Sequence, residues 1–145
     1  MQDLPHNYVV SASAEGANNV TVSAEGLPDL ETAGPHQFGG PGDVWSPETM
    51  LVGSVANWFI VSVRAIASIA KLVWVTLECV VDGELDKIEK FNQFSNFNVM
   101  ARLVITDEQY RKKAETILEK AEKYCLISNS LKAPAHLETE VIIAD

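Results

Sequence analysis

The feature that most constrains this fold is a long apolar segment at residues 50 to 75, interrupted by Asn57, Arg64 and Lys71. A membrane span needs about 20 residues with few or no charges, and Arg64 lies well inside the segment. We therefore expect no membrane span. A helix that is apolar on nearly every side is otherwise a buried helix. One chain of this length offers too little surface to cover such a helix, so we expect a second subunit to cover it.

Length and charge exclude several classes of protein. The 145 residues fit one domain, residues 1 to 145, with 47% apolar residues available for a core. The 20 acidic and 11 basic residues give a formal charge of −9. Because no cluster of lysine and arginine is dense enough to replace phosphate counterions, we expect no nucleic-acid partner. Two cysteines, Cys79 and Cys125, do not make a disulfide scaffold. The first six residues lack the pattern of a signal peptide, which predicts a cytoplasmic protein.

The apolar segment has a well-marked helix start. Ser46 suits the N-cap, Pro47 the first helical position, and Glu48 the first turn, where the helix dipole favours an acid. We expect this helix to end near Ile69. The residues before it, 26 to 43, are rich in glycine and proline and are interpreted as a linker. They fit neither the Walker nor the dinucleotide fingerprint.

The remaining patterns predict short strands and one further helix. Strands are expected at residues 8–14, 20–24, 71–82, 97–105 and 137–143, with turns at 16–19 and 83–90. In the third strand, Val73, Val75, Leu77, Cys79 and Val81 share the apolar face. A second helix begins after Thr106-Asp107-Glu108, and its apolar stripe is Tyr110, Ala114, Ile117, Leu118, Ala121 and Cys125. This order predicts an α+β fold with a mostly antiparallel sheet.

Three motifs carry a resemblance to a known family. They are the helix from Pro47-Glu48 to Trp58-Phe59, the stretch Leu77-Glu78-Cys79-Val80-Val81-Asp82-Gly83-Glu84-Leu85, and the stretch from Ala121 to Leu131. Their order and spacing are similar to those of the OsmC/Ohr thiol peroxidases. Residues 38–43 also resemble a glycine-rich lead-in of some members. The chain therefore resembles the OsmC/Ohr family, whose helix carries Cys-Phe where this chain has Trp58-Phe59.

The resemblance implies a fold, an assembly and a chemistry. The fold is OsmC-like, with long central helices buried between the sheets of an intertwined homodimer and active sites at the subunit interface. In the family, a peroxidatic thiolate reduces a hydroperoxide, a second thiol resolves the sulfenic acid to a disulfide, and a dithiol restores both. An N-terminal arginine and the glutamate near the helix start hold the thiolate ionised.

Two of those four positions are vacant here. An indole is no nucleophile, so Trp58 cannot attack a peroxide. The first arginine is Arg64, which follows Trp58 by six residues and points to another face of the helix. Glu48 and Cys125 remain as candidate catalytic residues. The helix dipole alone explains Glu48, and Cys125 is expected at a helix end on an apolar stripe, where the dipole and desolvation keep a thiol protonated.

Other chemistries find no motif. His6, His36 and His136 show no metal-ligand spacing, and neither a nucleophile elbow nor a His-Glu-x-x-His motif occurs, so no cofactor or metal is expected. Two hypotheses stay open. One is a non-catalytic OsmC-like dimer in which Trp58 and Phe59 line the cleft for a small apolar or hydroperoxide-like ligand, unless Trp58 fills that cleft. The other is an atypical thiol-dependent hydroperoxide reductase that acts through Cys125.

Overall fold

The computed structural model describes all 145 residues, which form two compact units, Met1–Met50 and Leu51–Asp145. Each unit is described by itself. The boundary falls in the first turn of the long helix, so nearly all of that helix belongs to the second unit. The prediction of a single domain stays a prediction.

The first unit is a three-stranded antiparallel sheet. Its strands β1 (Ser11–Ser13), β2 (Val20–Ser23) and β3 (Leu30–Thr32) are adjacent in chain order, and the short 3-10 helix η1 (His36–Phe38) follows them. Strands β1 and β2 fall inside the predicted ranges. Strand β3 corrects the prediction of a linker at residues 26–43, because Leu30–Thr32 pairs with β2 and Thr21 donates a hydrogen bond of 2.6 Å to Glu31 across that pair. Gly16 lies in the predicted turn at residues 16–19 and has a φ of 58°, a positive value that glycine adopts without strain.

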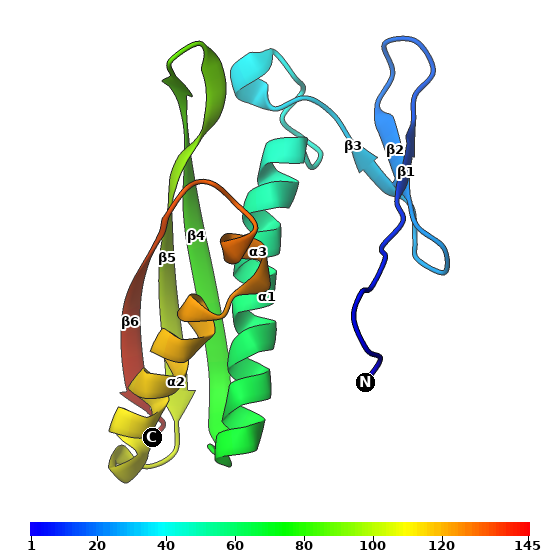
Figure 1. Cartoon of the computed structure of the whole chain (residues 1–145). Coiled ribbons are helices and arrows are strands. Elements are labelled where there is room, and N and C mark those ends of the chain that lie inside the picture. Colours follow the sequence, from blue (N-terminus) through cyan, green and yellow to red (C-terminus); the bar gives the residue numbers. More distant parts are fainter. The chain divides into compact units, whose positions relative to one another are not determined.

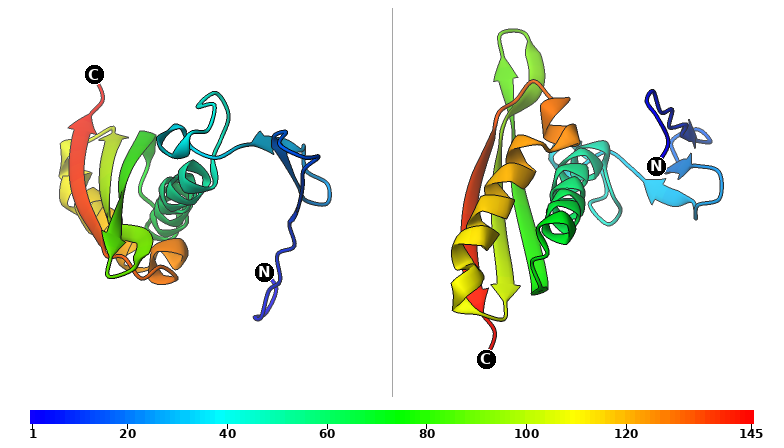
Figure 2. Two further views of the ribbon diagram at one scale, coloured as in Figure 1. Left: turned by 90° about the horizontal axis from the view of Figure 1, so that it is seen from above. Right: turned by 60° about the horizontal axis from the view of Figure 1, so that its bottom comes forward.

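The second unit packs its helices on a second three-stranded sheet. Its strands are β4 (Trp74–Ile88), β5 (Phe91–Ile105) and β6 (Ala135–Ile143), with β5 in the centre. Strand β5 is antiparallel to β4 and parallel to β6, so the sheet is mixed. The helices are α1 (Pro47–Ala70), η2 (Glu108–Tyr110), α2 (Arg111–Lys123) and α3 (Leu126–Asn129). Figures 1 and 2 show α1 and α2 on the same side of this sheet. The α+β prediction is confirmed.

The core of the second unit lies between α1, α2 and one face of the sheet. In β5 the predicted inward residues Phe97, Val99, Ala101, Leu103 and Ile105 are all buried, which confirms the alternation. They meet one stripe of α1, formed by Val55, Phe59, Val63 and Ala67. They also meet the α2 residues Ala114, Ile117, Leu118 and Ala121. The predicted stripe of α2 holds except at Tyr110, which is exposed because it lies in η2, before the helix proper.

Strand β4 departs from its predicted pattern at both ends. A register shift between Trp74 and Thr76 turns Trp74 inward with Leu77 and leaves Val73 and Val75 exposed, which corrects the predicted inward face. Such a bulge adds one residue and moves the following side chains to the other face. At the other end, β4 continues to Ile88, where a loop was predicted. Residues 84–88 resemble a loop in sequence because three of the five are charged, and none of them is buried.

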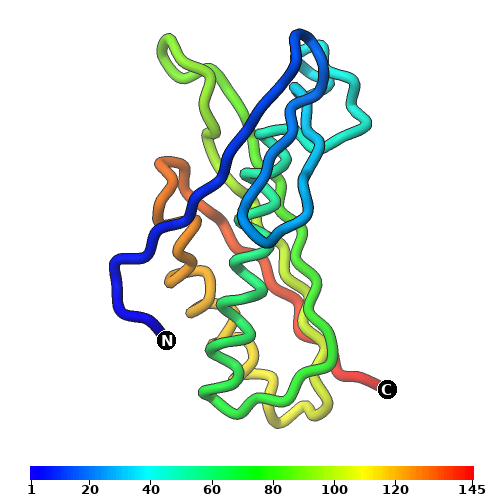
Figure 3. The backbone as a smooth tube through the Cα atoms, turned by 90° about the vertical axis from the view of Figure 1, so that its right-hand side faces the viewer, coloured from blue at the N-terminus to red at the C-terminus, as the bar shows by residue number.

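The extended hairpin reaches past its third strand. Strand β6 pairs with β5 only from Phe97 to Ile105, whereas the β4–β5 pair continues to Ile88 and Phe91. Figure 3 shows this hairpin tip projecting beyond the start of β6. Residues 91–96 of β5 therefore have a strand on one side only.

By length and composition alone, α1 is long and apolar enough to cross a membrane. Core helices pass the same test, and its Val55, Phe59, Val63 and Ala67 side chains are buried against the sheet. Both its ends agree with the prediction to within one residue. We interpret α1 as a core helix whose remaining faces are not covered by this sheet.

Candidate functional site

The start of α1 is held by reciprocal hydrogen bonds. The Thr49 backbone N–H donates to Ser46 Oγ at 3.1 Å, and the Ser46 backbone N–H donates to Thr49 Oγ1 at 2.8 Å. This confirms Ser46 as the N-cap, in a capping box closed by Thr49. Glu48 lies in the first turn, as predicted. Its Oε2 atom is buried and has no hydrogen-bond partner in the chain. The preference of the first helical turn for an acid explains why a glutamate stands at position 48, but it does not explain why Oε2 has no partner.

Trp58 and Phe59 occupy different environments in the middle of α1. Phe59 is only 2% exposed and belongs to the core between α1 and the sheet, so within this chain it is a packing residue and not part of a cleft wall. Adjacent helix residues differ by about 100°, so Trp58 lies on the flank of α1. Its indole Nε1 is buried and has no acceptor in the chain. An unpaired buried donor costs about 1–3 kcal/mol, so Trp58, like Glu48, carries a buried polar atom for which the chain supplies no partner.

Cys125 is buried at a helix end, as predicted, and a second short helix starts directly after it. Helix α2 ends at Lys123, and Cys125 is the N-cap residue of α3 with φ −65° and ψ 111°. It therefore lies between two helices. The predicted place at a helix end is confirmed, because Cys125 directly follows Tyr124, the C-cap of α2, and its backbone N–H donates to the Glu122 carbonyl at 3.2 Å. Burial of the side chain remains the reason to expect a slow thiol.

Cys79 packs on the inward face of β4, as predicted, beside Leu77 and Val81. Burial, and to a lesser degree the charge that Cys125 would carry, raise the pKa of the Cys79 thiol to about 11. The two cysteines are thus electrostatic neighbours although they are far apart in the sequence. No sequence pattern signals this proximity, and both thiols are free.

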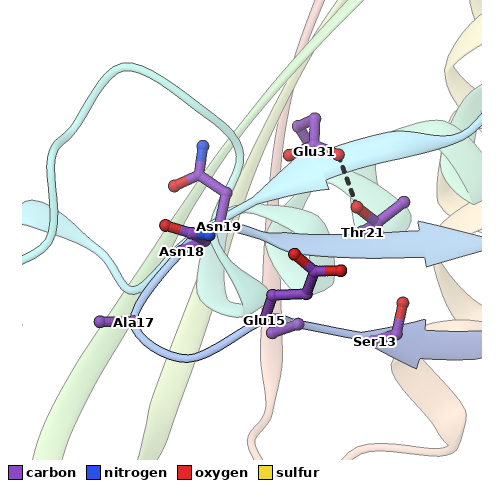
Figure 4. A pocket seen from close by; sticks show the side chains of 8 residues that line it. Ser13, Glu15, Ala17, Asn18, Asn19, Thr21 and Glu31 are labelled. Atoms are coloured by element: carbon purple, nitrogen blue, oxygen red, sulfur yellow. Dashed lines mark hydrogen bonds between the residues drawn. The ribbon is translucent and has the colours of Figure 1, made fainter.

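The other candidate groups do not gather. Arg64 is exposed on α1, and His6, His36 and His136 are exposed on separate segments. No group of three or more histidine, cysteine, aspartate or glutamate side chains could hold a metal ion. An open, polar hollow of about 780 Å³ lies around the β1–β2 turn of the first unit (Figure 4). Its side chains include Glu15, Asn18, Asn19 and the hydrogen-bonded pair Thr21 and Glu31.

Comparison with protein families gives one match, which covers most of the chain. The family of OsmC-like proteins matches residues 40–140, which include α1, both cysteines and most of the second sheet. The chain belongs to the OsmC family. Comparison with curated proteins gives no match.

Solved OsmC structures share the fold. An OsmC-like protein of unknown function from Vibrio cholerae has a TM-score of 0.83 at 15% identity, covering 95% of this chain and 100% of that one. An organic hydroperoxide resistance protein OsmC from Legionella pneumophila has a TM-score of 0.75 at 20% identity, covering 97% and 100%. One from Elizabethkingia anophelis, with thiocyanate bound, has a TM-score of 0.74 at 19% identity and the same coverage. At these identities, the likeness establishes the OsmC fold.

Proposed function

We propose that this chain is a homodimeric OsmC-like protein of the cytoplasm that lacks the two-cysteine peroxidase reaction and instead binds a small apolar ligand. One observation carries the proposal: the position expected for the peroxidatic cysteine holds Trp58, whose indole N–H is buried and unpaired. An indole cannot form a sulfenic acid, so the first step of the family's chemistry has no nucleophile at this position. Two free cysteines fit a reducing compartment.

The ligand class follows from the same side chain. An indole ring provides a large apolar face, and its N–H is a donor only. A small apolar molecule with one hydrogen-bond acceptor would contact the ring and satisfy the unpaired N–H, so we expect an alcohol, ketone or hydroperoxide with an apolar body. Phe59 takes no part, because it fills the core. Glu48, with its unpaired Oε2, is a second polar group on the same helix, about 15 Å along its axis from Trp58.

The homodimer is supported by the composition of α1. The helix is apolar over most of its 24 residues, yet its buried positions form one stripe, and Ile69 at its far end is 84% exposed. A second copy would remove this apolar surface from water at about 25 cal/mol per Å². Gel filtration should give about twice the chain mass of 15.9 kDa. A stable monomer at micromolar concentration contradicts this part of the proposal.

The activity test compares three proteins with cumene hydroperoxide and a dithiol reductant. We expect no turnover by the natural chain or by Cys125→Ala. Turnover by the natural chain that is lost in Cys125→Ala contradicts the non-catalytic proposal. Trp58→Cys restores the missing thiol, and its turnover measures how far the rest of the site is intact. Inactive Trp58→Cys protein indicates that the missing N-terminal arginine matters as well.

The ligand test uses cumyl alcohol, an apolar alcohol with one acceptor oxygen. Binding should change the fluorescence of the natural chain, and Trp58→Phe should weaken it about 5- to 10-fold, as expected for one hydrogen bond of about 1 kcal/mol. Trp74→Phe is the matched control, since Trp74 lies on β4 and packs against the core. Equal affinity of all three proteins contradicts the role of the Trp58 N–H.

The second candidate is a thiol-dependent reductase that acts through Cys125. One observation favours it: both thiols are free, and Cys79 lies close enough to Cys125 for their charges to interact. In that reaction, the Cys125 thiolate attacks the outer peroxide oxygen, forming a sulfenic acid and releasing the alcohol, and a dithiol then reduces the sulfenic acid with loss of water. The Cys125→Ala protein separates this candidate from the first.

A further inference from the structure

The face of the second sheet that points away from α1 and α2, here called the outer face, carries no covering layer. Both helices pack on the opposite face (Figures 1 and 2). On the outer face the strand registers place Val80 of β4 beside Met100 of β5, and Met100 beside Glu138 of β6. Val80 is 59% exposed and Met100 is 45% exposed. A solvated sheet face is usually polar, so this apolar pair at the centre of the outer face departs from the pattern.

Carboxylates surround the apolar pair. The acidic side chains of the outer face are Glu78, Asp82 and Glu84 of β4 and Glu138 and Glu140 of β6. Apart from His136, the face has one basic side chain, Arg102, which lies 3.6 Å from Glu140. Five carboxylates against one guanidinium leave a net charge of −4 on this face. Glu78, Asp82 and Glu138, which flank the apolar pair, take part in no salt bridge of the chain.

The charge of the outer face selects the chemistry of a partner. A second copy of this chain would bring the same negative charge to a symmetric contact, and like charges across an interface are unfavourable. A nucleic acid would bring phosphates, which are also anionic. A cationic protein segment with an apolar side complements both the carboxylates and the apolar pair.

The spacing of the carboxylates fits a helix that lies along β5, the central strand. Neighbouring strands are about 4.8 Å apart, so the carboxylates of β4 and those of β6 stand about 10 Å apart across β5. An α-helix with its side chains is about 10–12 Å wide. A helix placed over Met100 would therefore have Glu78 and Asp82 along one flank and Glu138 along the other.

We propose that the outer face binds an amphipathic basic helix of another protein. The apolar stripe of that helix covers Val80 and Met100, and lysine or arginine side chains on its two flanks pair with Glu78, Asp82 and Glu138. Methionine is flexible and polarizable, and it is common on surfaces that bind helices of varied sequence. The outer face lies across the sheet from α1, so binding there leaves Trp58 free for its own ligand. Because exposed ion pairs contribute little singly, we expect a dissociation constant of about 1–100 μM.

The probe is a synthetic peptide of about 14 residues in which leucine and lysine recur with the period of a helix. Fluorescence anisotropy of a dye on the peptide measures its affinity. Asp82→Asn with Glu138→Gln should weaken binding about three- to tenfold, because two ion pairs are lost while the side-chain shapes are kept. Glu115→Gln with Glu119→Gln, on the exposed side of α2, is the matched control. It removes the same charge from the chain and should change the affinity less than about twofold, because salt screens distant charges.

A second comparison tests the apolar centre. Val80→Ser with Met100→Ser should weaken binding about tenfold, because less apolar surface is removed from water. A peptide of the same composition in scrambled order has the same charge but no apolar stripe. It should bind the natural chain at least about tenfold more weakly, since only its charges find partners.

Methyl resonances of methionine locate the bound peptide without any substitution. The chain has three methionines, Met1, Met50 and Met100. Titration with the peptide should shift the Met100 methyl signal and leave those of Met1 and Met50 in place. The proposal is overturned by a peptide that binds without shifting Met100, or by equal affinities of the natural chain and the Asp82→Asn, Glu138→Gln variant. Equal binding of the scrambled peptide, or no binding at about 1 mM peptide, overturns it as well.

Discussion

Gly83 lies where β4, β5 and α1 meet, and replacing it with alanine tests how tightly they pack. A Cβ atom there would lie 2.7 Å from Val52 Cγ2 and 3.1 Å from Cε1 of both Phe94 and Phe97. None of the three can move freely. Val52 is β-branched and stiff in a helix, and the two rings stack at a centroid distance of 5.2 Å. Overpacking of this kind costs about 1–3 kcal/mol.

A smaller effect acts in the opposite direction. Glycine in a strand interior is about 0.5–1 kcal/mol less favourable than alanine, because its unfolded chain has more freedom to lose. The net expectation for Gly83→Ala is a loss of about 1–2 kcal/mol in the free energy of unfolding. Urea denaturation followed by circular dichroism measures it, with an unchanged slope expected because the exposed surface hardly changes.

Two further variants of this chain test the prediction more closely. Gly34 has no positive φ, and a Cβ atom added to it would meet nothing within 4 Å, so Gly34→Ala is a matched control that should be neutral or slightly stabilising. In Gly83→Ala with Val52→Ala, the new methyl group fills space that Val52 has vacated. The two changes should therefore sum to less than their separate costs by about 0.5 kcal/mol or more. A Gly83→Ala protein at least as stable as the natural chain refutes this account of the packing.

Three other predictions concern single groups. Ser46→Ala removes the acceptor for the Thr49 N–H and should lower the free energy of unfolding by about 0.5–2 kcal/mol in urea denaturation, whereas Ser46→Asp should retain most of it; equal loss in both variants contradicts the cap. Burial raises the pKa of Cys79 from 9.0 to about 11, so the folded state favours the protonated thiol. The contribution of this thiol to the free energy of unfolding is complete below pH 9 and declines as the pH rises from 9 towards 11. The natural chain should thus lose stability over that range relative to Cys79→Ala, and identical pH profiles would show that the thiol titrates normally. Hydrogen bonds from Arg111 lower the pKa of Glu108, so its stabilisation is present above the ordinary carboxyl pKa of 4.5 and is lost as the pH falls through the lower folded value. Glu108→Gln should be less stable than the natural chain at pH 7 and equal to it at pH 2 in thermal unfolding, and a constant difference at both values contradicts the titration.

The sequence predicted the elements whose burial follows one regular period. The cap at Ser46, the α1 ends, the inward face of β5 and the buried stripe from Ala114 to Ala121 all follow from residue spacing and helix-start chemistry. Each of these elements buries one face, so its apolar residues recur with the period of the helix or the strand.

The failures have local causes. The bulge at Trp74 inverts two positions of β4, and no composition signal marks it. Residues 84–88 are strand without a buried face, so their polarity resembles that of a loop. Strand β3 is three residues long and held by its pairing with β2. For the site, the start of α3 directly after Cys125 and the proximity of Cys79 to Cys125 depend on tertiary contacts that spacing does not encode.

The buried stripe of α1 has a consequence for position 58. Phe59 is fixed in the core together with Val55 and Val63, one helical turn before and after it, so the rotation of α1 about its own axis is set by residues other than Trp58. Whatever side chain stands at position 58 leaves the helix in the same direction. The orientation of the side chain at position 58 is therefore set by the rest of the helix and does not depend on which residue stands there. A cysteine introduced by Trp58→Cys would therefore project from α1 in the same direction as Trp58, with no change in the fold.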